Sequence, residues 1–425
     1  MAVTVLQQPT TPNVTNTNLV YTLSSSLAGS PQFRYVTDVY ESGSGNYITT
    51  LKNYPNTTGN TNIDVSRILN DRLSYDEYWK ITGSIAPVES VKTFDLRFGE
   101  EYGTSVSSSR TTYTGSSSNY LQVFPGNVYK NEGSFNFNTS SFDGPGNPYL
   151  TNDPAAQTEE LFPDGDYAYL VNSTDYHTVT IFEDTSGTPA SIQIRGSKLE
   201  NGINTVVNTL TIPLTPPVGA FNTIGVGPQN LSDYTGSWAN YIANGDINVI
   251  YSLNDPGGFV MYINDKWDGV PAKIFPSNWY APKTFKQCSD EYTRFAFINQ
   301  YGFWDYYNVY NPLRRVTNVN RSLYERPFVR YEDSQALYDI SDRGNKQYKT
   351  EYTDQYEITT DFIDKPTGDW LTELFDSPSV YIQKNGQFIP VNILNTTVDW
   401  NMNENRQKLF QYTIQFKYAN DRITR

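Results

Sequence analysis

The chain of 425 residues has one histidine, His177, and one cysteine, Cys288. A single cysteine excludes an intrachain disulfide and a zinc cage built from cysteines. Every Ser-His-Asp, Cys-His or His-rich metal arrangement has to include His177. That residue lies in "STDYHTVTIF", where we expect a surface or half-buried residue at the entrance to a strand. Cys288 in "KQCSDEY" has no histidine nearby, so we expect a small buried thiol rather than a nucleophile.

Positive charge and long apolar runs are also scarce. The chain has 31 Lys and Arg against 45 Asp and Glu, a net charge of −14, which argues against a nucleic-acid partner. The N-terminal stretch "MAVTVLQQPTTPNVTNTN" lacks the charged and apolar regions of a signal peptide, and no apolar run approaches the ~20 residues of a membrane helix. We therefore expect a soluble, unprocessed protein without membrane insertion.

Aromatic residues are plentiful at 15%, including 34 Tyr, while charged residues reach only 18%. This composition favours β structure, and the length favours several domains. We predict an all-β, multi-domain fold of β-sandwich-like domains with a few short helices. The predicted domains are an N-terminal sandwich over 1–103, a middle β-rich domain over 104–280 that begins with a polar linker, and a C-terminal β domain over 281–425.

Several elements are specified by local pattern. In the N-terminal domain "FRYVTDVY" alternates like a strand, "IDVSRILNDRL" predicts a short helix capped by Asp64 or Ser66, and "VKTFDLRFGEEYG" turns Phe94, Leu96 and Phe98 to one face. The middle region predicts strands in "YAYLV", "HTVTIFED", "SIQIRG", "VNTLTIPL", "DINVIYSL" and "GFVMYIND".

The C-terminal third has the clearest signals. Asn385-Gly386 between two alternating runs predicts a tight hairpin. Just before it, "GDWLTELFDSP" predicts a helix that packs Trp370 onto the hairpin, and "LFQYTIQFKY" predicts a last strand with one buried face.

Sites of chemistry are hard to find. "IGVGPQN" offers Gly225 and Gly227 without a third glycine, and we expect no following helix, so it does not predict a phosphate loop. "PDGDY" and "NDKWDG" place oxygen ligands at Asp164, Asp166, Asn264, Asp265 and Asp268, yet they lack the EF-hand pattern, and acidic turns are the preferred interpretation.

The adjacent carboxylates in the sequence do not predict a catalytic site either. Glu100-Glu101 and Glu159-Glu160 are neighbours that a strand would turn to opposite faces, so neither pair is placed for glycoside hydrolysis. We predict no catalytic residue, no cofactor, no metal site and no enzyme activity.

The aromatic run "TRFAFINQYGFWDYYNVYNP" includes Phe303, Trp304, Tyr306 and Tyr307. Exposed, these rings would stack on a sugar; buried, they would belong to two strands, "RFAFIN" and "WDYYNVY", joined at a Tyr-Gly turn. We favour the buried hairpin, with use at a subunit interface as the next option.

Five stretches together resemble structural proteins of tailed bacteriophages. The resemblance covers roughly the first 100 and last 150 residues, as pattern rather than as a chemical motif, and leaves the middle region unmatched. The stretches are "FRYVTDVYESGSGNYITTLKNYPNTTGNTNIDVSRILNDRL", "FDLRFGEEYG", "RFAFINQYGFWDYYNVYNP", "WLTELFDSPSVYIQKNGQFIPVNI" and "LFQYTIQFKYANDR".

The resemblance implies a virion component of a tail, baseplate or collar, made in the bacterial cytoplasm, whose partners are copies of itself and other virion proteins. Such proteins act through interfaces rather than turnover. The alternative is a tail-tip receptor- or carbohydrate-binding protein that takes a host surface glycan on residues ~120–275. A glycan-degrading enzyme is the third and least favoured interpretation.

Overall fold

The structure is a computed structural model in which the chain divides into two units. The first comprises Met1–Trp279, Phe297–Tyr306 and Thr372–Ser377, and the second Tyr280–Ala296, Tyr307–Leu371 and Pro378–Arg425. The residues described are 3–82, 85–88, 90–103, 110–111, 119–126, 169–172, 174–183, 191–200, 203–213, 220–243, 247–254, 262–263, 266–267, 271–275, 292–325, 329–338, 344–363, 365–396 and 411–420. Strands far outnumber helices among them, which confirms the all-β, multi-domain prediction.

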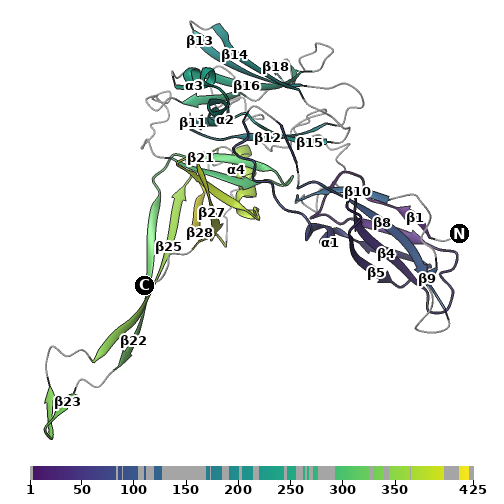
Figure 1. The fold of residues 1–425 in the computed structure, drawn as a ribbon, viewed down its shortest axis with the longest axis horizontal. Helices are drawn as coiled ribbons and strands as arrows, with labels where there is room; N and C mark the ends of the chain where they lie inside the picture. The colour runs from purple at the N-terminus through teal and green to yellow at the C-terminus, as the bar shows by residue number, and fades with distance from the viewer. Residues whose placement is uncertain are drawn as a thin grey trace. The chain divides into compact units, whose positions relative to one another are not determined.

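The N-terminal part of the first unit is a sandwich of two sheets (Figure 1). One sheet has the order β1 (Thr4–Gln7), β3 (Val20–Ser24), β6 (Asn60–Asp64). The other has the order β2 (Asn13–Val14), β10 (Asn119–Phe124), β8 (Lys92–Glu101), β4 (Arg34–Glu41), β5 (Tyr47–Asn53), with β9 (Arg110–Thr111) beside β8. Both sheets contribute to one core.

Alternation along β8 shows why this core forms. Phe94, Leu96 and Phe98 point into the core beside Tyr21 of the facing sheet, while Arg97 is exposed, as the sequence predicted. Burying each such side chain contributes about 1.5–3 kcal/mol. The sheet runs through β10 to Phe124, beyond the expected boundary at residue 103; the three-domain division itself stays a prediction.

The predicted short helix is α1 (Ser66–Asn70). Its first amide, that of Ser66, donates to Asp64 Oδ1 over 3.0 Å, and Leu69 lies in the sandwich core. The helix is shorter than the apolar pattern, which continues to Leu73.

The middle region of the first unit forms further sheets. One has the order β12 (Thr178–Glu183), β15 (Ala220–Gly225), β7 (Ile85–Pro87), and another β11 (Tyr169–Asn172), β19 (Pro271–Phe275), β16 (Ile247–Asn254), β13 (Ser191–Glu200), β14 (Ile203–Pro213). β17 (Tyr262–Ile263) pairs with β18 (Lys266–Trp267). Five of the six strands predicted in this region overlap β11, β12, β13, β14 and β16. Of the sixth, "GFVMYIND", only Tyr262 and Ile263 are among the described residues, and they form β17.

Two helices follow β15, which corrects the expectation that none follows the Gly225–Gly227 stretch. They are α2 (Pro228–Tyr234) and α3 (Gly236–Ala243). Gly227 is the N-cap of α2 and Pro228 its first residue, a start that proline's fixed φ favours. The pattern was missed because α2 has a single buried aliphatic side chain, Leu231.

The C-terminal part contains a seven-stranded sheet. Its order is β21 (Trp304–Val309), β20 (Thr293–Ile298), β26 (Val380–Lys384), β27 (Gln387–Ile393), β28 (Thr413–Tyr418), β25 (Asn345–Thr359), β22 (Arg314–Glu325). Asn385 and Gly386 have φ of 52° and 69°, which confirms the predicted hairpin between β26 and β27. The predicted helix is α4 (Lys365–Asp376). Its Trp370 contacts Tyr307 of β21, and its packing on the hairpin stays a prediction.

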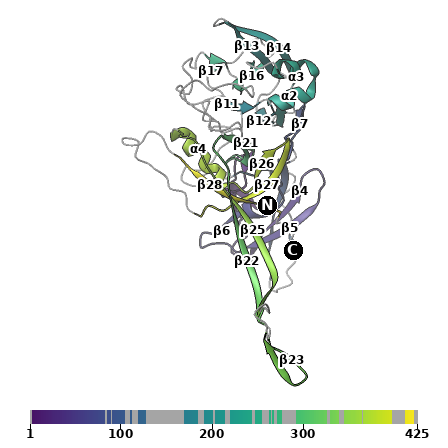
Figure 2. The ribbon, with the colours of Figure 1, turned by 90° about the vertical axis from the view of Figure 1, so that its left-hand side faces the viewer.

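β22 and β25 continue together beyond the other strands of their sheet, as both views show (Figures 1 and 2). β25 pairs with β28 only through Tyr356–Thr359, whereas it pairs with β22 from Asn345 to Glu357. We call β22 and β25 together the arm. A second hairpin, β23 (Val329–Glu332) and β24 (Gln335–Tyr338), lies between them in sequence.

Candidate functional site

The aromatic run lies inside the protein. Phe303, Trp304 and Tyr306 are 4%, 7% and 2% exposed, and Tyr307 is half-buried. The predicted turn closes through the amide of Asn299, which donates to the Phe303 carbonyl over 2.8 Å. Rings with so little exposed surface offer no stacking platform to a sugar.

Phe303 and Trp304 each pack on rings from distant segments. The Phe303 ring lies 5.7 Å from that of Phe124 and 5.9 Å from that of Phe221. Trp304 donates from Nε1 to the Asp76 carbonyl over 2.5 Å, and its ring lies 5.2 Å from that of Trp79. This cluster joins β10, β15 and the segment around Asp76 within the first unit.

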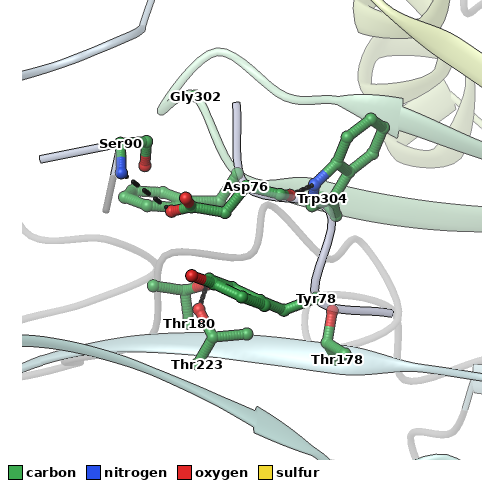
Figure 3. Close-up of a pocket in the computed structure, with 9 residues that line it drawn as sticks. Asp76, Tyr78, Ser90, Thr178, Thr180, Thr223, Gly302 and Trp304 are labelled. Atoms are coloured by element: carbon green, nitrogen blue, oxygen red, sulfur yellow. Dashed lines mark hydrogen bonds between the residues drawn. The ribbon is translucent and has the colours of Figure 1, made fainter. Parts of the chain in front are cut away.

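Beside this cluster is a cavity of about 10 Å³, lined by the residues of Figure 3. The amide of Ser90 donates to Asp76 Oδ2, and the hydroxyls of Thr180 and Thr223 lie 2.9 Å apart below the Tyr78 ring. A volume of this size has room for roughly one water molecule. The cavity therefore cannot hold a sugar or a nucleotide.

His177 is 2% exposed, which corrects the expectation of a surface or half-buried residue. Its ring lies 4.8 Å from that of Tyr306, whose hydroxyl is 2.7 Å from that of Thr178. The start of this sequence stretch is polar, and the imidazole is buried because the chain just before β12 packs against Tyr306 of the aromatic run. The side chain that packs on the His177 ring is thus a core tyrosine, Tyr306, rather than a serine or cysteine that could act as a nucleophile.

The contacts around Asn230 of α2 explain why glycine occupies positions 225 and 227. The Asn230 amide donates from Nδ2 to the carbonyls of Trp79 and Ile81 over 2.9 and 2.8 Å, and its Oδ1 accepts the His177 amide over 2.9 Å. A Cβ on Gly225 would lie 2.3 Å from the Ile81 carbonyl oxygen, and one on Gly227 would lie 2.3 Å from the His177 nitrogen. Both glycines thus serve close packing.

Four of the described carboxylates have structural partners. Glu100 accepts the Ser25 hydroxyl inside the sandwich, and its neighbour Glu101 pairs with Lys52 over 2.7 Å. Glu373 accepts a hydrogen bond from the backbone N–H of Gln300, and Asp305 accepts one from the side-chain amide of Asn299. The neighbours Glu100 and Glu101 point apart, as predicted.

Other candidates give no site. Within the described ranges, no group of three or more His, Cys, Asp or Glu side chains is arranged to hold a metal ion, and no helix there has the length and apolarity to cross a membrane. Four candidate groups from the sequence fall outside the described residues. They are Cys288, the pair Asp164 and Asp166, the trio Asn264, Asp265 and Asp268, and the pair Glu159-Glu160.

The arm is an exposed part of the second unit. Of the twelve residues of β22, only Ser322 is half-buried, and the others are exposed. Large apolar side chains nevertheless recur along both strands, with Tyr348 66% and Leu323 58% exposed. The others are Val316, Val319, Tyr324 and Tyr352. Exposed apolar side chains repeated along one element mark an interaction surface.

Both faces of the arm carry such groups. Val319 opposes Tyr352 on one face, because residues paired across antiparallel strands share a face. Val316 and Tyr324 lie on the other face, where the Tyr324 ring is 6.0 Å from that of Tyr348. Within the described residues no other element pairs with β22.

Opposite charges pair on the arm. Arg315 donates to Asp354 Oδ2 over 2.6 Å, and this hydrogen bond raises the pKa of the guanidinium. Lys349 pairs with Glu351, and that hydrogen bond lowers the pKa of the carboxyl below its usual value. The two strands carry five basic and four acidic residues, so the arm is nearly neutral in a chain of net charge −14.

Comparison with known proteins gives no further guide to function: no family model matches the chain, and no curated protein matches it either. Sequence reasoning assigned no element between Pro312 and Gly368 and so missed the arm. The stretch "RRVTNVNRSLYE" gave little signal, because its Val, Leu and Tyr residues do not alternate with polar residues at a period of two.

Proposed function

We propose that this chain is a structural component of a tailed-phage virion, in a tail, baseplate or collar assembly, and acts through protein–protein interfaces. The observation that carries the proposal is the arm, a long two-stranded ribbon with apolar side chains exposed on both faces. A protein that works alone in water gains nothing from such a surface, whereas an assembly module buries it against a neighbour.

The buried aromatic run supports the same proposal. Phe303, Trp304 and Tyr306 are used in packing, and the cavity beside them is too small for a substrate. The resemblance of the terminal regions to phage structural proteins names the kind of assembly. Turnover of a substrate is not part of this function.

The protein composition of purified phage particles tests this proposal. The particles are prepared from a lysate of the bacterium that produces the phage and expresses this gene. We expect quantitative mass spectrometry of gradient-purified particles to find the chain at a fixed ratio to the major head protein. Cryo-electron microscopy should then place it in a symmetric ring or fibre. A chain that stays in the soluble fraction and is missing from washed particles would contradict the proposal.

A further inference from the structure

β22 is an edge strand along its whole length. Among the described residues it pairs with β25 alone, so the other edge of its twelve residues presents backbone N–H and C=O groups to solvent. Such an edge is a template for a strand from another chain. Arg314, Arg315 and Arg321 restrict the register in which another strand can pair, because arginines placed directly opposite one another repel.

The arm also needs further strands for its own stability. A two-stranded ribbon is only marginally stable in water, and three or more strands are usually required. The part of β25 before Tyr356 has β22 as its described neighbour and does not reach β28. A partner that adds strands would therefore order the arm.

We propose that the partner is a second copy of this chain, and that the β22 strands of two copies pair antiparallel about a two-fold axis at Asn320. The product is a four-stranded sheet in the order β25, β22, β22, β25. This inference rests on the proposed function and names the partner of the arm. Its chemistry is self-complementary, as a two-fold interface requires.

Charge selects the register. When two copies of one strand pair antiparallel about a two-fold axis, opposing residues must point to the same face of the sheet. The axis can therefore pass only beside one residue, which then opposes its own copy, and not between two residues. Centring on Asn320 opposes Arg315 to Glu325 twice and Val316 to Tyr324 twice. The pairing then covers residues 315–325, nearly the full strand.

Neighbouring registers do not combine these features. A centre at Val319 gives a pairing of the same length but places Arg315 opposite Leu323, so it contains no pair of opposite charges. A centre at Asn318 opposes Arg315 to Arg321, and a centre at Arg321 places the two copies of that arginine together. A centre at Leu323 does oppose Arg321 to Glu325, but it pairs only residues 321–325. Asn320 is therefore the centre that combines opposite charges with a long pairing.

Cysteine cross-linking tests the register in the full chain. In a Cys288→Ala background, which removes the natural thiol, Asn320→Cys should form a disulfide-linked dimer with oxidised glutathione, because residues paired across strands lie within disulfide reach. Asn318→Cys is the matched control, since it would face Ser322 of the other copy. We expect at least about tenfold more dimer from Asn320→Cys.

A double variant gives a positive control. Asn318→Cys and Ser322→Cys in one chain lie four residues apart along a strand, too far to bridge internally, yet they should cross-link two copies. If Asn320→Cys gives no more dimer than Asn318→Cys while circular dichroism shows both folded, the pairing is overturned. Sedimentation of the unmodified chain as a monomer at every concentration would overturn it as well.

The two proposals fail separately. If the chain is found in particles but β22 does not cross-link to itself, another virion protein covers the arm and only the second-copy inference fails. If Asn320→Cys cross-links but the chain is absent from particles, the pairing stands and the virion function fails.

Discussion

Asn230 ties three segments together through a single buried amide. Replacing it by alanine would leave two carbonyls and the His177 N–H without that partner. Each buried polar group left unsatisfied costs about 1–3 kcal/mol, so we expect Asn230→Ala to lower the free energy of unfolding by about 3–5 kcal/mol. Urea unfolding measures this, with the exposed strand residue in Asn62→Ala as control at under about 0.5 kcal/mol. Equal effects of the two variants would contradict the role of Asn230.

Gly302 and Gly45 separate packing from backbone strain. Both have positive φ, 84° and 68°, but a Cβ on Gly302 would lie 1.1 Å from the Pro125 carbonyl oxygen, whereas Gly45 has open space. Gly45→Ala should therefore cost about 1–2 kcal/mol from strain alone. Gly302→Ala should cost at least about 3 kcal/mol or prevent folding, because the turn after β20 must move away from Pro125. Unfolding midpoints of the two variants compare the costs, and a similar loss in both would show that the loop around Pro125 yields easily.

At the scale of elements, local signals predicted what local chemistry decides. The Asn385-Gly386 hairpin, α4 and the inward Phe94–Phe98 side of β8 follow from turn residues and from periodicity, and the structure confirms them. α2 was missed because a helix of seven residues with one buried Leu has almost no period.

The arm was missed for a different reason. Hydrophobic periodicity reports burial, and almost every residue of β22 is exposed, so the strand lacks the contrast between a buried and a wet face. His177 shows the converse, since a polar stretch gave no sign that β12 would be covered by Tyr306. Both outcomes depend on contacts between segments far apart in sequence, which a pattern along the chain does not contain.

The arm can be removed without touching the sheet that carries it. Arg315 and Tyr356 oppose each other, so replacing residues 316–355 by Asn-Gly should close β22 onto β25 with a tight turn. We expect unfolding of the remaining sheet within about 1 kcal/mol of the full chain, because Ile358, Ile414 and Phe416 keep their burial. Size-exclusion chromatography with light scattering should show that self-association is lost.

Phe416→Ala in the chain that keeps its arm is the control for a loss of core stability. It leaves the arm unchanged and removes a fully buried ring, so it should cost about 3–5 kcal/mol. Loss of stability in the arm replacement comparable to that of Phe416→Ala would mean that the arm is part of the core structure rather than an assembly element.

The charge of the whole molecule acts against the pairing of its arms. Each copy carries a net charge of −14, so two copies repel at long range, while the nearly neutral arm is the part that can approach a neighbour most easily. The repulsion falls as salt shortens the Debye length from about 30 Å at 0.01 M to about 8 Å at 0.15 M.

Salt should therefore strengthen the dimer. The two Arg315–Glu325 pairs would be solvent-exposed and would contribute little to the free energy of association. Salt that screens these pairs weakens the dimer less than it strengthens it by screening the repulsion between two acidic molecules. We expect sedimentation velocity to give a dissociation constant at least about threefold lower at 0.15 M than at 0.01 M NaCl. The chain with residues 316–355 replaced by Asn-Gly should stay monomeric at both concentrations. A dimer that weakens steadily with salt would show that ion pairs along the arms, and not the charge of the rest of the molecule, control association.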